Sequence, residues 1–164
     1  LIGDPQVRSR GTLGGSLANN DPAADYPAGA LALNASIITN QRTIAAQDFF
    51  QGLYTTALHP NELILEVRFQ IPEKSSYVKL KQAASGYALV GVFVAKFAPN
   101  SYQIAVTGVG DGVFRWHEAE LALAKNQSIP VLERANLIED IHASSKYRSH
   151  MTRVLLEQAI AKII

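Results

Sequence analysis

The sequence contains no cysteine, and it has only one tryptophan and one methionine in 164 residues. The lack of thiols excludes disulfides, thiolate zinc sites, cysteine nucleophiles and cysteine-bound iron–sulfur clusters within this chain. It fits a reducing compartment, and we expect a cytoplasmic location. An excess of charge is also missing, because 15 basic residues face 14 acidic ones. The net charge of +1 gives no reason to expect a nucleic-acid or membrane-surface partner.

Long apolar runs are missing as well. The longest, residues 88–95 and 104–109, have the length of strands, whereas a membrane span needs about 20 apolar residues. No secretory signal peptide is recognisable. The chain starts at Leu1 and not at methionine, so we expect a processed product or a fragment. With 48% hydrophobic residues it can form one domain or two small ones around a core.

Residues 8–27 are the most informative stretch, because three glycines fall within residues 11–15 and two arginines precede them. Glycine lets the backbone approach a ligand closely, and backbone N–H groups in such a turn can hold an anion. The pattern therefore predicts a phosphate- or pyrophosphate-binding loop over residues 12–20. It has neither the Gly-Lys-Ser/Thr ending of a nucleotide-triphosphate loop nor the Rossmann glycine spacing. An ordinary tight turn remains the alternative.

The chain before residue 12 is expected to be an extended lead-in, and a helix should follow the loop. Asp21 is a suitable N-cap with Pro22 in the first helical position, and Pro27 predicts a late start or a kink. Asn34 is a plausible end. The patterns that follow predict strands at 35–39 and 43–45, a short helix at 46–50, and a half-buried strand with apolar residues at 63, 65, 67 and 69.

The second half predicts an antiparallel meander followed by helices. Its expected strands are residues 77–82, 88–97, 102–109 and 113–116, and its expected helices are 117–125, 131–138 and a last one capped by Ser144 or Ser145. The apolar stripe of the last helix should comprise Tyr147, Met151, Val154, Leu155, Ala159 and Ile163. The fold class is therefore α+β: a small antiparallel sheet with helices in residues 1–72, then a three- to four-stranded antiparallel sheet packed on a helical bundle in residues 73–164.

Patterns for other chemistry are weak. The four histidines lack a metal-ligand spacing, so we expect no metal site, and no G-x-S-x-G elbow indicates a serine hydrolase. Trp116 is expected in the core. Arg8 and Arg10 could reach a phosphate or a partner subunit, or simply be solvated. We assign no catalytic acid, base or nucleophile.

Residues 4–25 as a whole resemble the flavoprotein (medium) subunit of the carbon monoxide dehydrogenase/xanthine dehydrogenase family of molybdenum hydroxylases. The family signature is R-N-R-G-T-I-G-G-N/S-L-A-x-x-D-P-A-A-D, and here Ser9 and Leu13 replace the commoner Asn and Ile. Three later segments are similar in the same order. They are residues 79–92 (K-x-x-Q-x-x-S…A-x-V), 108–120 (G-V-G…R-A-x-E-A-E) and 140–148 (D-x-x-A-S-x-x-Y-R).

The resemblance implies an FAD-binding subunit with a PCMH-type FAD domain in residues 1–72 and the family's C-terminal flavoprotein domain in 73–164. Its cofactor-binding residues carry over to Thr12, Leu13, Gly14, Gly15 and Ser16 for the diphosphate and ribityl region, to Asp25 for the flavin, and also to Ile64 and Lys81. Asp25 could instead be an acid near a helix start, and Lys81 a solvated strand lysine. The family's earlier FAD subdomain has no match, so we expect the isolated chain to be inactive and to bind FAD weakly or not at all.

By the same resemblance, electrons would pass from a large subunit with the molybdenum cofactor through 2Fe–2S clusters in a small subunit to FAD. They would then reach NAD⁺, a quinone or oxygen. The alternative function is a non-catalytic module that docks the other subunits without binding FAD by itself. A stand-alone anion or nucleotide binder is a third possibility. The sequence identifies neither the hydroxylated substrate nor the electron acceptor.

Overall fold

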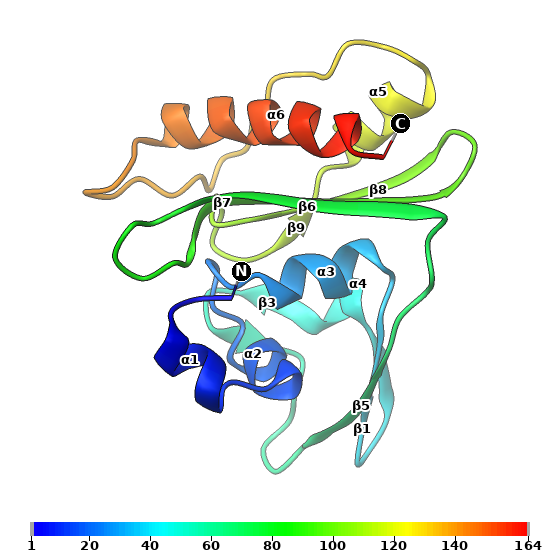
Figure 1. Ribbon diagram of the computed structural model, residues 1–164. Coiled ribbons are helices and arrows are strands. Elements are labelled where there is room, and N and C mark those ends of the chain that lie inside the picture. The colour runs from blue at the N-terminus through cyan, green and yellow to red at the C-terminus, as the bar shows by residue number, and fades with distance from the viewer. Residues whose placement is uncertain (1, 164) are drawn as a thin grey trace.

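A four-stranded antiparallel sheet lies at the centre of the computed structural model, which describes residues 2–163 (Figure 1). Its strands pair in chain order: β6 (Lys74–Lys81), β7 (Ala88–Ala98), β8 (Ser101–Thr107) and β9 (Phe114–Arg115). Helices α5 (His117–Ala124) and α6 (Ser145–Ala161) cover one face, and α3 (Tyr26–Ala32) packs on the other. The predicted α+β class and the meander are confirmed.

The first half of the chain surrounds α3. It contains α1 (Pro5–Arg10), α2 (Leu13–Asn19) and α4 (Ala46–Phe49). A second antiparallel sheet has the order β2 (Thr43–Ala45), β1 (Ser36–Thr39), β5 (Ile64–Arg68), and β3 (Phe50–Gly52) pairs with β4 (Thr55–Thr56). The predicted strands at 35–39 and 43–45 and the short helix at 46–50 are confirmed.

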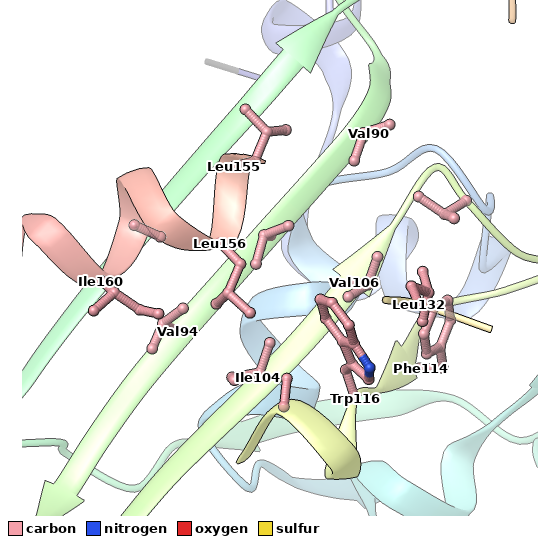
Figure 2. Close-up of a cluster of buried hydrophobic side chains, with 14 of the residues drawn as sticks. Val90, Val94, Ile104, Val106, Phe114, Trp116, Leu132, Leu155, Leu156 and Ile160 are labelled. Atoms are coloured by element: carbon pink, nitrogen blue, oxygen red, sulfur yellow. The ribbon is translucent and has the colours of Figure 1, made fainter. Parts of the chain in front are cut away.

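Alternation along β7 and β8 builds a separate core on each face of the central sheet. Val90, Val94, Ile104 and Val106 meet α6 residues such as Leu156 on one face, as Figure 2 shows. Trp116 is buried in the same core, as predicted. On the opposite face the second core combines residues of α2, α3, β1 and α4 with Ala105, Val113, Tyr77 and Phe93. This second core therefore crosses position 72, where we propose the division into two units.

The glycine-rich segment is where the prediction was wrong in detail. Residues 13–19 are helical, and the helix begins inside the glycine run because Thr12 caps it. The Thr12 hydroxyl oxygen accepts a hydrogen bond from Gly15 N at 3.0 Å, and the Thr12 carbonyl accepts one from Ser16 N. Asp21 instead closes a local turn by accepting from Ala23 N at 2.8 Å. The lead-in also contains a helix, α1, which is capped by Asp4.

The predicted helix over residues 131–138 was also wrong, because tertiary hydrogen bonds hold this stretch in an irregular path. Leu137 forms a β-bridge with Gly110, and Ile138 N donates to the Val109 carbonyl at 2.8 Å. Leu132 is buried, and its carbonyl accepts from the Ser149 hydroxyl at 2.7 Å. The expected helical bundle is consequently reduced to α5 and α6.

A β-bulge changes the burial pattern of β5. The pairing with β1 shifts so that Glu66 lies opposite Ile38 but Ile64 lies opposite Thr39, which leaves Leu65 as the extra residue. Ile64 therefore packs against the second core, whereas Leu65 is 67% exposed. The predicted strand exists, but its simple alternation fails at the bulge.

Helix α6 starts after Ser144, whose hydroxyl oxygen accepts from Tyr147 N, as predicted. Its buried face includes Leu155 and Ala159 but also Arg148, whereas Tyr147 is exposed. The Arg148 guanidinium donates to the Leu89 and Gly108 carbonyls and to both oxygens of Asp140, all at 2.7–2.8 Å. Arg148 thus ties the helix to the ends of β7 and β8.

We predict that Arg148→Met lowers the free energy of unfolding by about 3 kcal/mol, because it removes a buried charge with its hydrogen bonds and leaves two carbonyls without these donors. Urea denaturation measures the effect. The matched control is Arg153→Met on the same helix, whose exposed pair with Glu157 should contribute less than about 0.5 kcal/mol. Equal effects of the two substitutions would contradict this account of α6.

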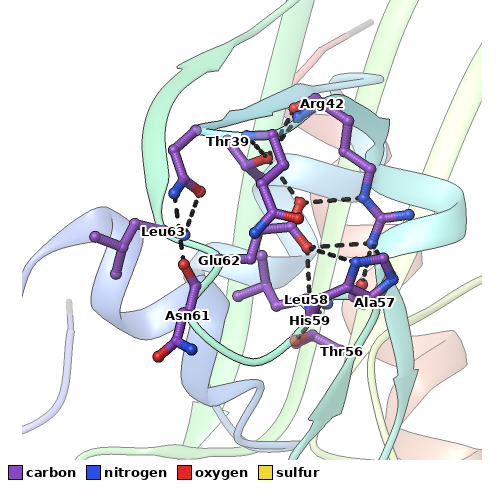
Figure 3. Close-up of polar contacts among 11 residues, drawn as sticks. Thr39, Arg42, Thr56, Ala57, Leu58, His59, Asn61, Glu62 and Leu63 are labelled. Carbon is purple, nitrogen blue, oxygen red and sulfur yellow. Dashed lines mark hydrogen bonds and ion pairs between the residues drawn. The ribbon is translucent and has the colours of Figure 1, made fainter.

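A polar cluster joins the β1–β2 turn to the segment before β5 (Figure 3). Arg42 donates to both Glu62 carboxylate oxygens at 3.1 and 3.2 Å, and the Thr39 hydroxyl and His59 N each donate to one of them at 2.7 Å. The hydrogen bonds from Arg42, and then those from His59 and Thr39, outweigh burial and lower the pKa of Glu62 to about 2.

This lowered pKa predicts a defined acid dependence. Glutamate in an unfolded chain has a pKa of about 4.3. The stabilisation from Glu62 is therefore fully present above that pH and is lost as the pH falls towards 2. The melting temperature of the wild type should therefore exceed that of Glu62→Gln by a constant margin above pH 5, and the margin should shrink below about pH 4. A margin that does not change between pH 6 and pH 3 would contradict the assignment.

Candidate cofactor site

A cavity of about 480 Å³ lies between the N-terminal segment, the start of α2 and the turn before α3. Its volume is in the range of small-molecule sites, about 300–1,000 Å³. It collects residues from three parts of the chain. The lining residues used below are Arg8, Arg10, Thr12, Gly15, Ser16, Asp21, Asp25 and Tyr87. The cavity is therefore lined by four of the predicted cofactor-binding residues, Thr12, Gly15, Ser16 and Asp25.

The first turn of α2 supplies the first group. The first N–H groups of a helix have no intrahelical partner, and here Thr12 satisfies the one from Gly15. Leu13 and Gly14 belong to the same turn but do not line the cavity. Leu13 packs against the second core, and a Cβ built on Gly14 would lie 3.9 Å from Ile64. Ile64 thus supports the helix start from behind.

The segment from Asp21 to Asp25 is held on the central sheet by hydrogen bonds to its backbone. The buried Thr107 hydroxyl is 2.8 Å from both the Pro22 and the Ala24 carbonyl oxygens. Gly108 N donates to the Pro22 carbonyl at 2.7 Å, and Ala88 N donates to the Ala23 carbonyl at 3.2 Å. The ends of β7 and β8 therefore determine where this wall of the cavity lies.

Asp25 connects the wall to β6 through its side chain. One carboxylate oxygen accepts a short hydrogen bond from the Tyr77 hydroxyl, and the other accepts from Lys79 Nζ at 2.7 Å. The side chains of Lys79 and Asp25 are only 3% and 6% exposed. Burial, reinforced by the neighbouring Asp25 carboxylate, raises the pKa of Tyr77 above its ordinary value, so this phenol stays protonated and keeps donating.

Lys81 does not reach the cavity. Strand alternation places residues 77, 79 and 81 on one face, but the pairing of β6 with β7 shifts between Leu80 and Lys81. Lys81 lies beyond this shift and is exposed. The lysine that meets Asp25 is Lys79, two residues earlier. The sequence predicts a strand at this position, but no local signal indicates the register shift between Leu80 and Lys81.

Two arginines and a tyrosine also line the cavity. Arg8 donates to the Ile2 and Gly3 carbonyls at 2.8 and 2.7 Å, which fixes the N-terminal segment. Arg10 is exposed at the cavity. Sequence reasoning missed Tyr87, which follows the β6–β7 turn. Burial and then the nearby carboxylates of Asp21, Asp4 and Asp25 raise its pKa. The cavity thus combines cationic and hydroxyl donors with one buried carboxylate, a set that suits an anionic ligand with a polar ring.

Two further tests concern the described residues only. Within residues 2–163, no cluster of three or more histidine and acidic side chains is placed to bind a metal ion. None of the helices found in this range combines the length and apolar character that crossing a bilayer requires.

Comparison with known proteins agrees with this geometry. The family described as "FAD binding domain in molybdopterin dehydrogenase" matches residues 1–74. The glyceraldehyde dehydrogenase medium chain of Sulfolobus acidocaldarius is 35% identical, with 99% of this chain and 64% of that protein covered. The nicotine 6-hydroxylase medium subunit of Paenarthrobacter nicotinovorans is 33% identical, with 98% and 63% covered. The chain therefore spans about 64% of the length of such relatives.

Solved structures show the same relationship in three dimensions. A chain of the carbon monoxide dehydrogenase from Oligotropha carboxidovorans matches with a TM-score of 0.82 and 30% identity, over 99% of this chain and 64% of that chain. A chain of the carbon monoxide dehydrogenase from Hydrogenophaga pseudoflava matches with a TM-score of 0.81 and 32% identity, over 98% and 63%. These likenesses confirm the resemblance found in the sequence motifs. Over nearly its whole length the chain is therefore similar to the medium chains of glyceraldehyde and carbon monoxide dehydrogenases, and its residues 1–74 match an FAD-binding domain of molybdopterin dehydrogenases.

Proposed function

We propose that this chain holds FAD in the cavity described above and relays electrons as part of a molybdenum hydroxylase. The observation that carries the proposal is that Thr12, Gly15, Ser16 and Asp25 line a single cavity within the region matched by the FAD-binding family. A chance arrangement of a tight turn would not also bring Asp25 to the same wall. No specific observation on residues 2–163 favours a docking module that binds no FAD.

The residues present fit the chemistry of FAD. Its diphosphate is anionic, and the cavity offers the guanidinium groups of Arg8 and Arg10 and the hydroxyl groups of Thr12 and Ser16. The first turn of α2 adds backbone N–H groups and the positive end of its dipole. We assign the start of α2, Thr12 to Ser16, to the diphosphate and ribityl region.

Asp25 is assigned to the flavin, as an acceptor of a hydrogen bond. Its carboxylate is paired with Lys79, so the pair places little net negative charge near an anionic cofactor. Ile64 is assigned an indirect role, because it backs Gly14. Lys81, the exposed last residue of β6, is assigned to any part of FAD that extends beyond the cavity.

When bound, FAD supplies the chemistry of accepting and passing on electrons, and the chain supplies binding, orientation and local charge. The names of the relatives indicate medium subunits of larger enzymes. We propose that partner subunits carry the molybdenum cofactor and 2Fe–2S clusters, that the final acceptor is NAD⁺, a quinone or oxygen, and that the assembly works in the cytoplasm.

Ser16 gives the sharpest test of the FAD site, because it lines the cavity at the start of α2. Alanine has a higher helix propensity than serine, so Ser16→Ala should be accepted by the fold. If the Ser16 hydroxyl donates to the cofactor, its loss should weaken FAD binding by about tenfold, which corresponds to about 1.4 kcal/mol.

The measurement is a flavin fluorescence titration of the intact polypeptide that contains this chain, together with its melting temperature. Ala18→Ser, an exposed change in the last turn of α2, is the matched control and should leave FAD affinity unchanged. Unchanged FAD affinity in a stable Ser16→Ala protein would refute the assignment of the α2 start. Gly15→Ala is less informative, because a Cβ there would lie 2.9 Å from the Thr12 hydroxyl and disturb the cap.

A further inference from the structure

We propose that Lys79, assisted by Tyr77, is a positioning residue of the flavin site. Neither side chain lines the cavity. Both act on it through Asp25, and Lys79 acts also through the β6–β7 turn. The inference rests on the proposed FAD site and extends it to a strand outside the segment that the FAD-binding family matches, residues 1–74.

The Asp25 carboxylate is held through both of its oxygens. Tyr77 and Lys79 donate to different oxygens of the same carboxylate, so its plane and direction are determined by two groups from one strand. Tyr77 and Lys79 lie on β6, which pairs with β7 along its length, and Asp25 directly precedes α3, which packs on the central sheet. A carboxylate held in this way presents a defined acceptor to a ligand.

Lys79 joins two walls of the cavity. Besides Asp25, Lys79 Nζ donates to the Gly86 carbonyl at 2.8 Å. Gly86 has φ of +72°, and a Cβ there would lie 2.7 Å from the Gly3 carbonyl oxygen, so the turn packs directly on the N-terminal segment. The next residue, Tyr87, lines the cavity. Lys79 thus links the wall before α3 to the wall formed by the β6–β7 turn.

Strand β7 leaves room for this arrangement. Gly91 lies opposite Lys79 in the pairing of β6 with β7. A Cβ at Gly91 would overlap the Tyr77 hydroxyl and would lie 2.8 Å from Thr107, whose own hydroxyl holds the Pro22 and Ala24 carbonyls. The glycine therefore allows Tyr77 and Thr107 to reach the same segment from adjacent positions.

The charges of the Lys79–Asp25 pair make the proposal testable. Lys79 and Asp25 together carry no net charge, and both are buried, so removing either charge leaves the other uncompensated in a medium that screens weakly. An uncompensated carboxylate beside FAD should disfavour its reduction, and an uncompensated ammonium should favour it. The two single neutralisations should therefore shift the flavin midpoint potential in opposite directions.

The experiment compares Lys79→Met, Asp25→Asn and the double variant in the native holoprotein. We expect a more negative midpoint potential for Lys79→Met, a more positive one for Asp25→Asn, and a value close to that of the wild type for the double variant. FAD affinity should fall about tenfold in Lys79→Met. In metal sites, removing the hydrogen-bond partner of a metal-binding side chain weakens binding by about 10- to 100-fold, and we expect the lower value here. Lys79→Arg, which keeps the charge, should restore most of the potential.

Lys74→Met is the matched control, since it makes the same substitution at the exposed first residue of β6, and it should leave both the potential and FAD content unchanged. If Lys79→Met fails to fold, the comparison of Asp25→Asn with the double variant still measures the effect of the Lys79 charge on the midpoint potential. Shifts of the same sign, or an altered melting temperature with unaltered potential and FAD content, would overturn the positioning role. Absence of FAD from the wild-type protein would show beforehand that the proposed function itself is wrong.

Discussion

The attachment of the Asp21–Asp25 segment to the central sheet is the interaction on which the rest of the site depends. Thr107 and Gly108 hold the Pro22 carbonyl, Ala88 holds that of Ala23, and β6 holds the Asp25 side chain. These contacts fix the start of α3, and α2 packs in turn against α3. The cavity between them therefore depends on a sheet that lies almost entirely beyond the family's FAD-binding segment.

This dependence changes how the two halves of the chain are related. A division near residue 72 follows the sequence motifs, but the second core includes Ala105 and Val113 together with α2, α3 and α4. Lys79 and Tyr87 likewise bring the second half to the cavity. The C-terminal half is thus a structural support of the cavity.

Local patterns predicted the elements whose causes are local. The meander from β6 to β9, the Ser144 cap of α6 and the buried Trp116 follow from alternation, capping and side-chain type. The motif around residues 4–25 also predicted four residues that the structure brings to one cavity, Thr12, Gly15, Ser16 and Asp25.

Most of the failures have nonlocal causes. Residues 131–138 have helical propensity, but hydrogen bonds to Val109 and Ser149 hold them in another path. The bulge at Leu65 and the register shift beside Lys81 depend on partner strands, so alternation alone could not locate them. The failure in the glycine run has a local cause: the run was interpreted as an anion-binding loop because glycines let the backbone approach a ligand, yet the Thr12 cap starts a helix within it.

The central claim is that FAD lies in the cavity lined by the start of α2 and Asp25, with Lys79 holding Asp25 from behind. An experimental structure of the FAD-loaded protein tests it most directly. The account predicts FAD within hydrogen-bonding distance of Thr12 or Ser16 and of Asp25, with the Lys79–Asp25 pair intact. FAD bound away from this cavity, or Lys79 released from Asp25 to contact the cofactor itself, would contradict it.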